Sequence, residues 1–315
     1  MPATRFCLSA TLVLCLLPGC APSWEGQSAG HAITVAVSIV PQAWLVEQIG
    51  GEHVRVITMI KPGESHEAYQ PTDAQVSQIM GAKVFFRIGM PFEQSPTFRS
   101  IQSSGKLTVV DVRQGMELRP MSRHSHADDT GGGGAFAGAG QHARHHEDPE
   151  ETADPHVWLT PRLLAIQART VAQTLQQLDP ANHDDYHRRL EAFLERLAQA
   201  DRAIRATLAP VKGKAFFVFH PAWGYFADEY GLRQVAIEVE GKDPSDRELT
   251  ELQKLARQER IKVVFVQPQI SSRAAEAVAQ AVGASVAILD PLVPDVAENL
   301  QRVARTLADL SLIHI

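Results

Sequence analysis

The residues at 181–208 read ANHDDYHRRLEAFLERLAQADRAIRATL. Apolar side chains recur along this stretch at steps of three or four residues, or multiples of them, which predicts one apolar face on a single long helix. These side chains are Tyr186, Leu190, Phe193, Leu197, Ile204 and Leu208. At about 1.5 Å per residue, such a helix is roughly 40 Å long. It therefore predicts a stiff spacer between the parts of the chain on either side.

On both sides of this helix, short runs rich in Val, Ile and Phe alternate with helical patterns, which is typical of βα units and parallel sheets. Roughly a hundred residues without a comparable strand signal separate two groups of four runs. We therefore predict an α/β fold with two lobes, each with a small, mainly parallel sheet flanked by helices, joined by the long helix. The runs are 33–40, 55–60, 84–89 and 107–112, and then 215–220, 234–239, 263–268 and 286–291.

Two further helices have clear limits in the sequence. A helical pattern at 161–178 stops at Asp179-Pro180, directly before the long helix. The capping-box pattern Ser245-Asp-Arg-Glu248 predicts a helix that continues to about Arg260.

The composition excludes several classes of protein. The chain has 315 residues, 44% of them hydrophobic and 21% charged, which does not suit a disordered or fibrous protein. The net charge of −6 lacks the basic character that nucleic-acid binding requires, so we expect no nucleic-acid partner. There are 13 histidines but only three cysteines, all within the first twenty residues. Cysteine metal sites and thiol nucleophiles are therefore not expected in the rest of the chain.

The N-terminus has the anatomy of a signal peptide at 1–19, with one basic residue followed by an apolar run at 6–17. That run is too short to span a bilayer. The sequence LPGC at 17–20 resembles a bacterial lipoprotein box, in which the cysteine is lipidated. We expect an exported, periplasmic or cell-surface protein that is anchored to a membrane through Cys20. Ordinary secretion, with no role for this cysteine, is the alternative.

These features predict the following division of the chain. A signal peptide at 1–19 and a tether at 20–31 precede an N-terminal lobe at 32–180, which includes a His-rich loop at 122–152. A linker helix at 181–209 leads to a C-terminal lobe at 210–309 and a tail at 310–315. The tail reads LSLIHI, which is also the translation of a common sequencing-adapter end, so an artefactual tail is the alternative to a native C-terminus.

Four polar residues stand at strand ends or at a helix start, where open α/β sheets bind ligands. His66 lies in the loop after the second run, and His156 directly precedes a helix. His220 ends the fifth run and Asp290 ends the eighth. Because two of these residues come from each half, we expect them to meet in a cleft between the lobes. Three imidazoles and one carboxylate suit a borderline-soft divalent ion, zinc first.

Each of these residues also has a structural explanation when it is taken alone. His220 would then be a histidine that caps a strand, and Asp290 a turn or helix-cap residue. Trp158 and Trp223 are more typical of core aromatic residues beside a site than of ligands.

A second group of histidines lies among acidic residues on a glycine-rich segment with no apolar periodicity. We expect this loop to hold zinc loosely, for capture, buffering or sensing; a solvated, disordered insertion without such a role is the alternative. The histidines of the loop are His124, His126, His142, His145 and His146.

Four segments of the chain resemble the metal-binding solute-binding proteins of zinc and manganese ABC transporters, the ZnuA type of the cluster A-I family. They are PGESHEAYQPT at 62–72, DPHVWL at 154–159, FHPAWGYFADEYGL at 219–232 and LDPL at 289–292. The resemblance implies two α/β lobes on a long backbone helix that close on one metal ion. It implies that this ion is bound by His66, His156, His220 and Asp290.

The resemblance also implies a function. The chain would be a binding protein and not an enzyme. It would capture Zn²⁺ outside the cytoplasmic membrane and deliver it to an ABC permease. Its partners would be this permease and, through the permease, the ATPase of the transporter. We expect the protein to be a monomer.

The first motif departs from the family pattern. The family has Pro before the first histidine and Tyr two residues after it, whereas this chain has Ser65 and Ala68 there. The departure leaves Glu64 or Glu67 as substitute carboxylate ligands. Gln267 also stands where the family commonly has an acidic residue.

The third motif indicates the metal. Manganese members of the family typically have Glu at the position of His220, and the softer imidazole favours zinc. A manganese-binding member of the same family is the first alternative. An exported zinc hydrolase or a surface adhesin belongs to a different class, and the chain has no HExxH helix or GxSxG elbow to support a hydrolase.

Overall fold

A computed structural model describes residues 32–121, 153–238, 244–269 and 272–312. All of these lie in one compact unit. The predicted signal peptide, the tether with Cys20 and the five histidines of the His-rich loop lie outside the described residues.

The first sheet has four parallel strands in the order β2-β1-β3-β4. The central strand β1 pairs with both β2 and β3, and its residues Val35, Ala36 and Val37 are fully buried. Such continuous apolar runs form strands that are covered on both faces. The elements of this part are β1 (Ile33–Val37), α1 (Val40–Gly50), β2 (Val54–Thr58), α2 (Asp73–Met80), β3 (Val84–Arg87), α3 (Pro96–Ser103), β4 (Thr108–Asp111) and the 3₁₀ turns at Gly51–His53 and Pro91–Gln94.

The second sheet repeats this topology, with four parallel strands in the order β6-β5-β7-β8. Its central strand β5 carries the buried run Ala215–Val218. Because all strands of a parallel sheet point the same way, the loops that follow them gather at one edge of each sheet. The elements are β5 (Ala215–Val218), α6 (Gly224–Tyr230), β6 (Arg233–Ala236), α7 (Asp246–Gln258), β7 (Val263–Val266), α8 (Ser272–Val282), β8 (Ser285–Ile288) and α9 (Val296–Leu312).

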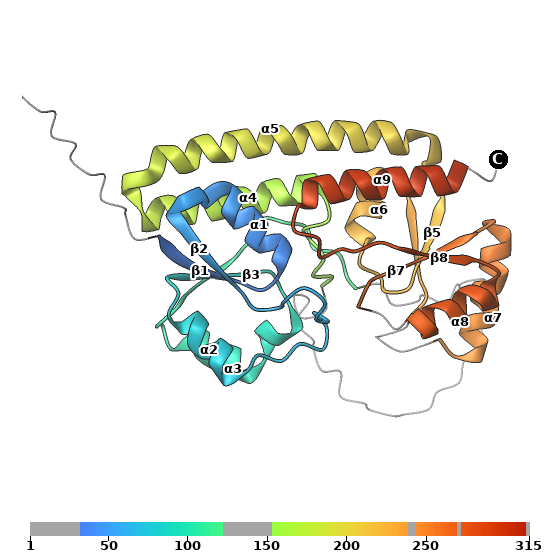
Figure 1. Cartoon of the computed structure of the whole chain (residues 1–315), viewed down its shortest axis with the longest axis horizontal. Coiled ribbons are helices and arrows are strands. Elements are labelled where there is room, and N and C mark those ends of the chain that lie inside the picture. Colours follow the sequence, from blue (N-terminus) through green and yellow to red (C-terminus); the bar gives the residue numbers. More distant parts are fainter. Residues whose placement is uncertain (1–31, 122–152, 239–243, 270–271, 313–315) are drawn as a thin grey trace, which may run out of the picture. The chain divides into compact units, whose positions relative to one another are not determined.

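The helix α5 (His183–Leu208) joins the two halves of this unit. It packs against α1 and α4 (Pro161–Leu178), which follow strands of the first half, and against α9 at the end of the second. Figure 1 shows α5 running alongside α4 and α9. All six apolar residues of its predicted face are buried. Helix packing of this extent makes α5 part of the main apolar core rather than an exposed connector.

The predicted fold class is confirmed, with two parallel sheets flanked by helices and a long helix between them. Each predicted strand has a counterpart, although the observed strands end one to three residues earlier. The predicted helix at 161–178 has the same limits in the structure. The long helix begins at His183 rather than at residue 181, because Pro180–Asn182 form a 3₁₀ turn.

Two further observations concern the helices. Helix α9 continues through Leu312, and Leu310 packs against the main core, so the helix extends into the predicted tail. In the part of the chain that the structure describes, no helix combines the length and the apolar character that a membrane crossing requires.

Candidate metal site

Three buried histidines converge at the strand ends of the two sheets. His66 follows β2, His156 precedes α4, and His220 follows β5 by two residues. The Nε2 atom of His156 lies 3.0 Å from Nε2 of His66 and 3.4 Å from Nε2 of His220. One ring nitrogen of each histidine lies within 4.8 Å of the others. The structure therefore brings together three of the four residues that the sequence singled out.

Asp154 fixes the orientation of the His156 ring. Its Oδ1 accepts a hydrogen bond from the His156 backbone N–H at 3.0 Å and lies 2.7 Å from the ring Nδ1. A carboxylate on Nδ1 holds the proton there, so Nε2 carries the free lone pair. Asp154 itself is buried and contacts Arg119, with Nη1 of Arg119 3.3 Å from Oδ2.

Two carboxylates hold the ring of His220 in the same way. Glu238, two residues past the end of β6, contacts Nδ1 of His220 through its Oε1, and Glu67 Oε1 lies 2.6 Å from the same nitrogen. Glu67 belongs to the loop after β2, whereas His220 and Glu238 belong to the second sheet's loops. The contact between Glu67 and His220 therefore links the two halves of the unit beside the histidines.

Trp158 forms a wall of this site. Its ring centroid lies 5.1 Å from that of His156 and 6.4 Å from that of His66, and the side chain is fully buried. Its indole N–H donates to the carbonyl oxygen of Pro291 at 2.7 Å, which ties the wall to the loop after β8. The interpretation of Trp158 as an aromatic residue beside the site agrees with this position.

The electrostatic environment differs between the histidines. Burial, with His156 and His220 alongside, lowers the pKa of His66 to about 3, so His66 is neutral at physiological pH. Burial alone would lower the pKa of His220, but the contacts with Glu238 and Glu67 outweigh it and raise this pKa to about 9. Without a metal ion the ring therefore carries a proton on both nitrogens, and metal binding would displace the proton from Nε2. The carboxylates therefore supply the negative charge that a divalent cation would need nearby.

The remaining candidate ligands lie outside the histidine group. Asp290 follows β8 by two residues, and its Oδ1 accepts a hydrogen bond from the Leu292 backbone N–H at 2.9 Å. The described residues contain two groups that could hold a metal ion, the three histidines and the set Glu67, His220 and Glu238. Asp290 belongs to neither group. Glu64 is exposed and accepts a hydrogen bond from the Lys61 backbone N–H at 2.8 Å. Both carboxylates thus have local partners that explain their positions.

Three residues at this site were not assigned a role from the sequence. Glu238 is the next-to-last residue of the sixth apolar run, near the position that His220 has in the fifth, so the same strand-end rule could have identified it. Asp154 stands in the DPHVWL motif, two residues before His156. Arg119 had no signal, because it lies in an irregular segment after β4 and reaches Asp154 only through the fold.

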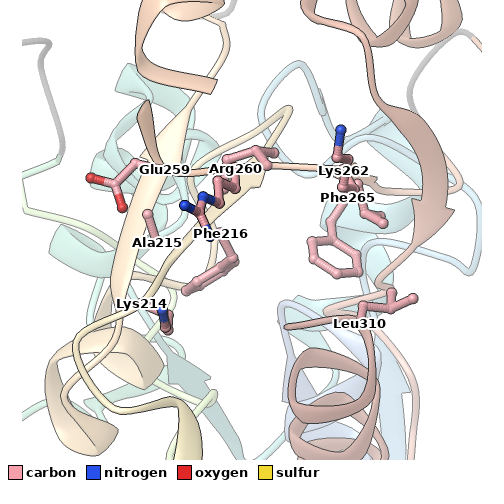
Figure 2. A pocket seen from close by; sticks show the side chains of 10 residues that line it. Lys214, Ala215, Phe216, Glu259, Arg260, Lys262, Phe265 and Leu310 are labelled. Carbon is pink, nitrogen blue, oxygen red and sulfur yellow. The ribbon is translucent and has the colours of Figure 1, made fainter. Parts of the chain in front are cut away.

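A separate hollow of about 400 Å³ lies at the opposite, amino-terminal edge of the second sheet (Figure 2). Phe216 and Phe265 form part of its apolar lining, and Lys214, Arg260 and Lys262 stand around it. No histidine occurs among its described lining residues. It is chemically and spatially distinct from the histidine site.

Two α/β halves joined by a long helix, with buried imidazoles converging at their strand ends, define a class of two-lobed binding protein whose site suits a metal ion. The family model described as "Zinc-uptake complex component A periplasmic" (ZnuA) matches residues 35–309, and the chain belongs to this family.

Individual relatives agree with this assignment. The chain is 26% identical over 271 residues to the "High-affinity zinc uptake system protein ZnuA" of Bacillus subtilis, covering 85% of this chain and 81% of that protein. It is 26% identical over 282 residues to the "Zinc-binding lipoprotein AdcA" of Streptococcus pneumoniae strain R6, covering 89% of this chain but only 54% of AdcA. A solved structure described as "Crystal structure of ZnuA" has a TM-score of 0.76 and 34% identity, and the match covers 89% of this chain and 99% of that one.

Proposed function

We propose that this chain is the zinc-capturing component of an ABC importer, which binds Zn²⁺ outside the cytoplasmic membrane and delivers it to the permease. The observation that carries this proposal is the convergence of the Nε2 atoms of His66, His156 and His220. At a Zn–N distance of about 2.0–2.1 Å and tetrahedral angles, two ligand nitrogens lie roughly 3.3–3.4 Å apart. The separations of 3.0 and 3.4 Å require only a small adjustment to hold the ion.

The donor set favours zinc over manganese. Three imidazole nitrogens suit zinc, whereas manganese prefers carboxylate, carbonyl and water oxygens. The family description and the names of the relatives also specify zinc. Capture and release, rather than catalysis, is the role that the family membership supports.

The fourth ligand is proposed to be a carboxylate. Asp290 stands in the loop after β8, and Glu67 already contacts the far nitrogen of His220. Either would have to leave its present partner in order to reach the ion. Substituting Asp290 and Glu67 separately by Ala distinguishes the two: the ligand's loss weakens zinc binding strongly, and the other substitution has a smaller effect.

The test of binding uses His66→Ala, His156→Ala and His220→Ala, with His183→Ala as a matched control. His183 is exposed at the start of α5, far along the chain from any of the three. In competition with a chromophoric chelator, each of the three variants should lose tight zinc binding while the control keeps it. An unchanged affinity in any of the three removes that residue from the site.

The test of transport is growth. A strain that lacks this protein should grow poorly when zinc is limiting, and added zinc should restore growth. Restoration by manganese but not by zinc would support the manganese alternative. A strain that grows normally under zinc limitation, and has no other zinc importer, would contradict the role in uptake.

Export and anchoring form a separate part of the proposal. The signal-peptide pattern and the LPGC sequence support lipidation of Cys20, and the name of the AdcA relative is that of a lipoprotein. Metabolic labelling with a radioactive fatty acid should mark the wild-type protein but not a Cys20→Ala variant. Equal labelling of both, or of neither, would contradict anchoring through this residue.

The His-rich loop at 122–152 is proposed to bind additional zinc weakly. Its five histidines and neighbouring acids supply nitrogen and oxygen donors on a glycine-rich segment. Deleting residues 122–150 should remove weak sites from a calorimetric titration and leave one tight site. An unchanged stoichiometry would show that the loop does not bind.

A further inference from the structure

We propose that Arg119 is a positioning residue for the metal ligand His156 and that it acts through Asp154. The inference rests on the proposed zinc site and adds a residue that does not touch the ion. Arg119 lies after β4, well before the motif that contains Asp154 and His156, and the fold alone brings them together.

The two oxygens of the Asp154 carboxylate have different partners. One oxygen, Oδ1, serves His156, through the ring Nδ1 at 2.7 Å and the backbone N–H at 3.0 Å. The other oxygen, Oδ2, accepts from Nη1 of Arg119 at 3.3 Å. Asp154 is buried, and a buried carboxylate is costly unless a cation or hydrogen-bond donors compensate it. Arg119 supplies a positive charge on the side that faces away from His156.

Residues of the second half of the unit hold the guanidinium of Arg119 in place. It lies over the ring of Tyr225, 5.8 Å from the centroid, and its Nε is 3.2 Å from Oδ2 of Asp228. At Gly224 a Cβ atom would fall 1.1 Å from Nη1 of Arg119. A side chain at this position would therefore displace the guanidinium, which explains why glycine begins α6.

The backbone of Arg119 makes contacts that do not depend on its side chain. The backbone N–H of Asp154 donates to the carbonyl of Arg119 at 2.9 Å. The hydroxyl of Tyr225 accepts from the backbone N–H of Arg119 at 3.1 Å and donates to the carbonyl of Asp154 at 3.0 Å. These contacts keep the two segments together whatever side chain stands at 119. A substitution of Arg119 thus tests the guanidinium and leaves the main-chain connections intact.

The consequence concerns how His156 presents Nε2. With Oδ2 engaged by Arg119, the carboxylate is held so that Oδ1 faces Nδ1 of His156, which fixes the ring and its tautomer. Without Arg119 the carboxylate is held only by the contacts of Oδ1 with His156, and the imidazole is oriented less firmly. Zinc affinity should then fall, although no direct ligand has changed.

A double-mutant cycle tests this inference. Zinc affinity is measured by chelator competition for the wild type, Arg119→Gln, Asp154→Asn and the double variant. Asp154→Asn should weaken binding about 10–100-fold, as is usual for a partner of a ligating histidine. Arg119→Gln alone should weaken it by a smaller factor, and the double variant should match Asp154→Asn. An unaltered affinity in Arg119→Gln, or losses that multiply in the double variant, would overturn the inference.

Arg162→Gln is the matched control. Arg162 and Arg119 line one surface hollow beside Tyr225, but the ion-pair partner of Arg162 is Glu229, at 2.8 Å, and not Asp154. Its substitution should leave zinc affinity unchanged. If Arg119→Gln does not fold, Arg119→Met, which also removes the guanidinium charge, replaces it in the cycle with the same expected order of affinities.

A spectroscopic measurement separates positioning from a general loss of stability. The absorption bands of the Co²⁺-loaded protein report the geometry of the metal site, so they should change in Arg119→Gln and stay unchanged in Arg162→Gln. Identical spectra in wild type and Arg119→Gln would contradict positioning. If the wild type itself fails to bind zinc tightly, the proposed function fails; if the wild type binds and Arg119→Gln binds equally well, only the role of Arg119 fails.

Discussion

At the scale of single residues, the histidines of the site depend on the carboxylates behind them. His156 has Asp154 at its Nδ1, and His220 has Glu238 and Glu67. In each case the acid holds the far nitrogen and leaves Nε2 to face the other rings. Because such partners fix the tautomer and the ring orientation, they affect metal affinity without contacting the ion.

Glu238→Gln tests this dependence at His220. An amide keeps the shape of the side chain but removes the charge that holds the Nδ1 proton, so zinc affinity should fall about 10–100-fold. The measurement is chelator competition, with Glu259→Gln as control because Glu259 pairs with Arg233 and lies by the opposite edge of the second sheet. Equal affinities in the two variants would show that Glu238 does not support the ligand.

Asp111 offers a pH-dependent test of folding stability away from the site. Burial opposes its ionisation, but the hydrogen bonds from Arg113, at 2.7 to 3.0 Å, outweigh burial and hold the pKa of Asp111 below its ordinary value. A pKa that is lower in the folded state contributes stability above the ordinary pKa. This contribution disappears as the pH falls through the folded-state value.

Asp111→Asn should therefore lower the free energy of unfolding by about 1–3 kcal/mol at pH 6, because hydrogen bonds to a charged group are lost. The difference from wild type should shrink as the pH is lowered toward 3. Urea unfolding curves at several pH values measure both effects. A difference that grows on acidification would contradict the direction of the shift.

The sequence predicted the three histidines because each stands next to a strand end or a helix start with Pro or Gly nearby. It did not predict how their far nitrogens are held. The sequence offers Glu67 as a substitute ligand but does not indicate its contact with the outer nitrogen of His220. Arg119 meets Asp154 and Asp228 only through the tertiary fold, which no local pattern reveals.

At the scale of elements, α5 carries the connection between the two halves. Phe193 is buried on its apolar face and packs edge-on against Trp44 of α1, with ring centroids 5.4 Å apart. Further along the same face, Leu197, Ile204 and Leu208 continue the buried stripe. The helix is thus held along its length rather than only at its ends.

Phe193→Ala tests the importance of this packing. The loss of a buried aromatic side chain should lower the free energy of unfolding by about 3–5 kcal/mol. Glu191→Ala, on an exposed face of the same helix, should change it by no more than about 0.5 kcal/mol. Urea unfolding measures both. Similar values for the two variants would mean that this face of α5 adds little to the core.

The elements were predictable because their signals are local. Short apolar runs marked the eight strands of the described residues, and the Ser245–Glu248 pattern coincides with the cap of α7. The strand ends were predicted too late because apolar residues continue into the loops: Phe219 and Ile237 are buried although they lie past β5 and β6. Burial, rather than strand pairing, explains the apolar character there.

At the scale of the whole described unit, a stiff helix predicts small tilts rather than wide hinge closure when zinc binds. The histidines come from both halves, so a bound zinc ion would fix the position of one half relative to the other. Helix α5 limits how far the two halves can separate. The motion is expected to be local, at the loops after β2 and β5 and in slight rotation about α5.

Spin labels test this expectation. Thr97→Cys on α3 and Gln258→Cys on α7, both exposed positions, report the distance between the two halves on a Cys20→Ser background. Adding zinc should narrow the distance distribution and move its centre only slightly. A shift of the mean distance comparable to the size of a lobe would contradict the stiff-helix account. If neither the mean distance nor the spread of the distribution changes, zinc binding does not move the two halves, which would also contradict it.

The measurement that tests the central claim most directly is anomalous diffraction from zinc-loaded crystals, recorded above and below the zinc edge. The account predicts one strong anomalous peak about 2.0–2.1 Å from the Nε2 atoms of His66, His156 and His220. A peak that lacks any of these three nitrogens as a ligand, or tight binding with no peak between them, would contradict it.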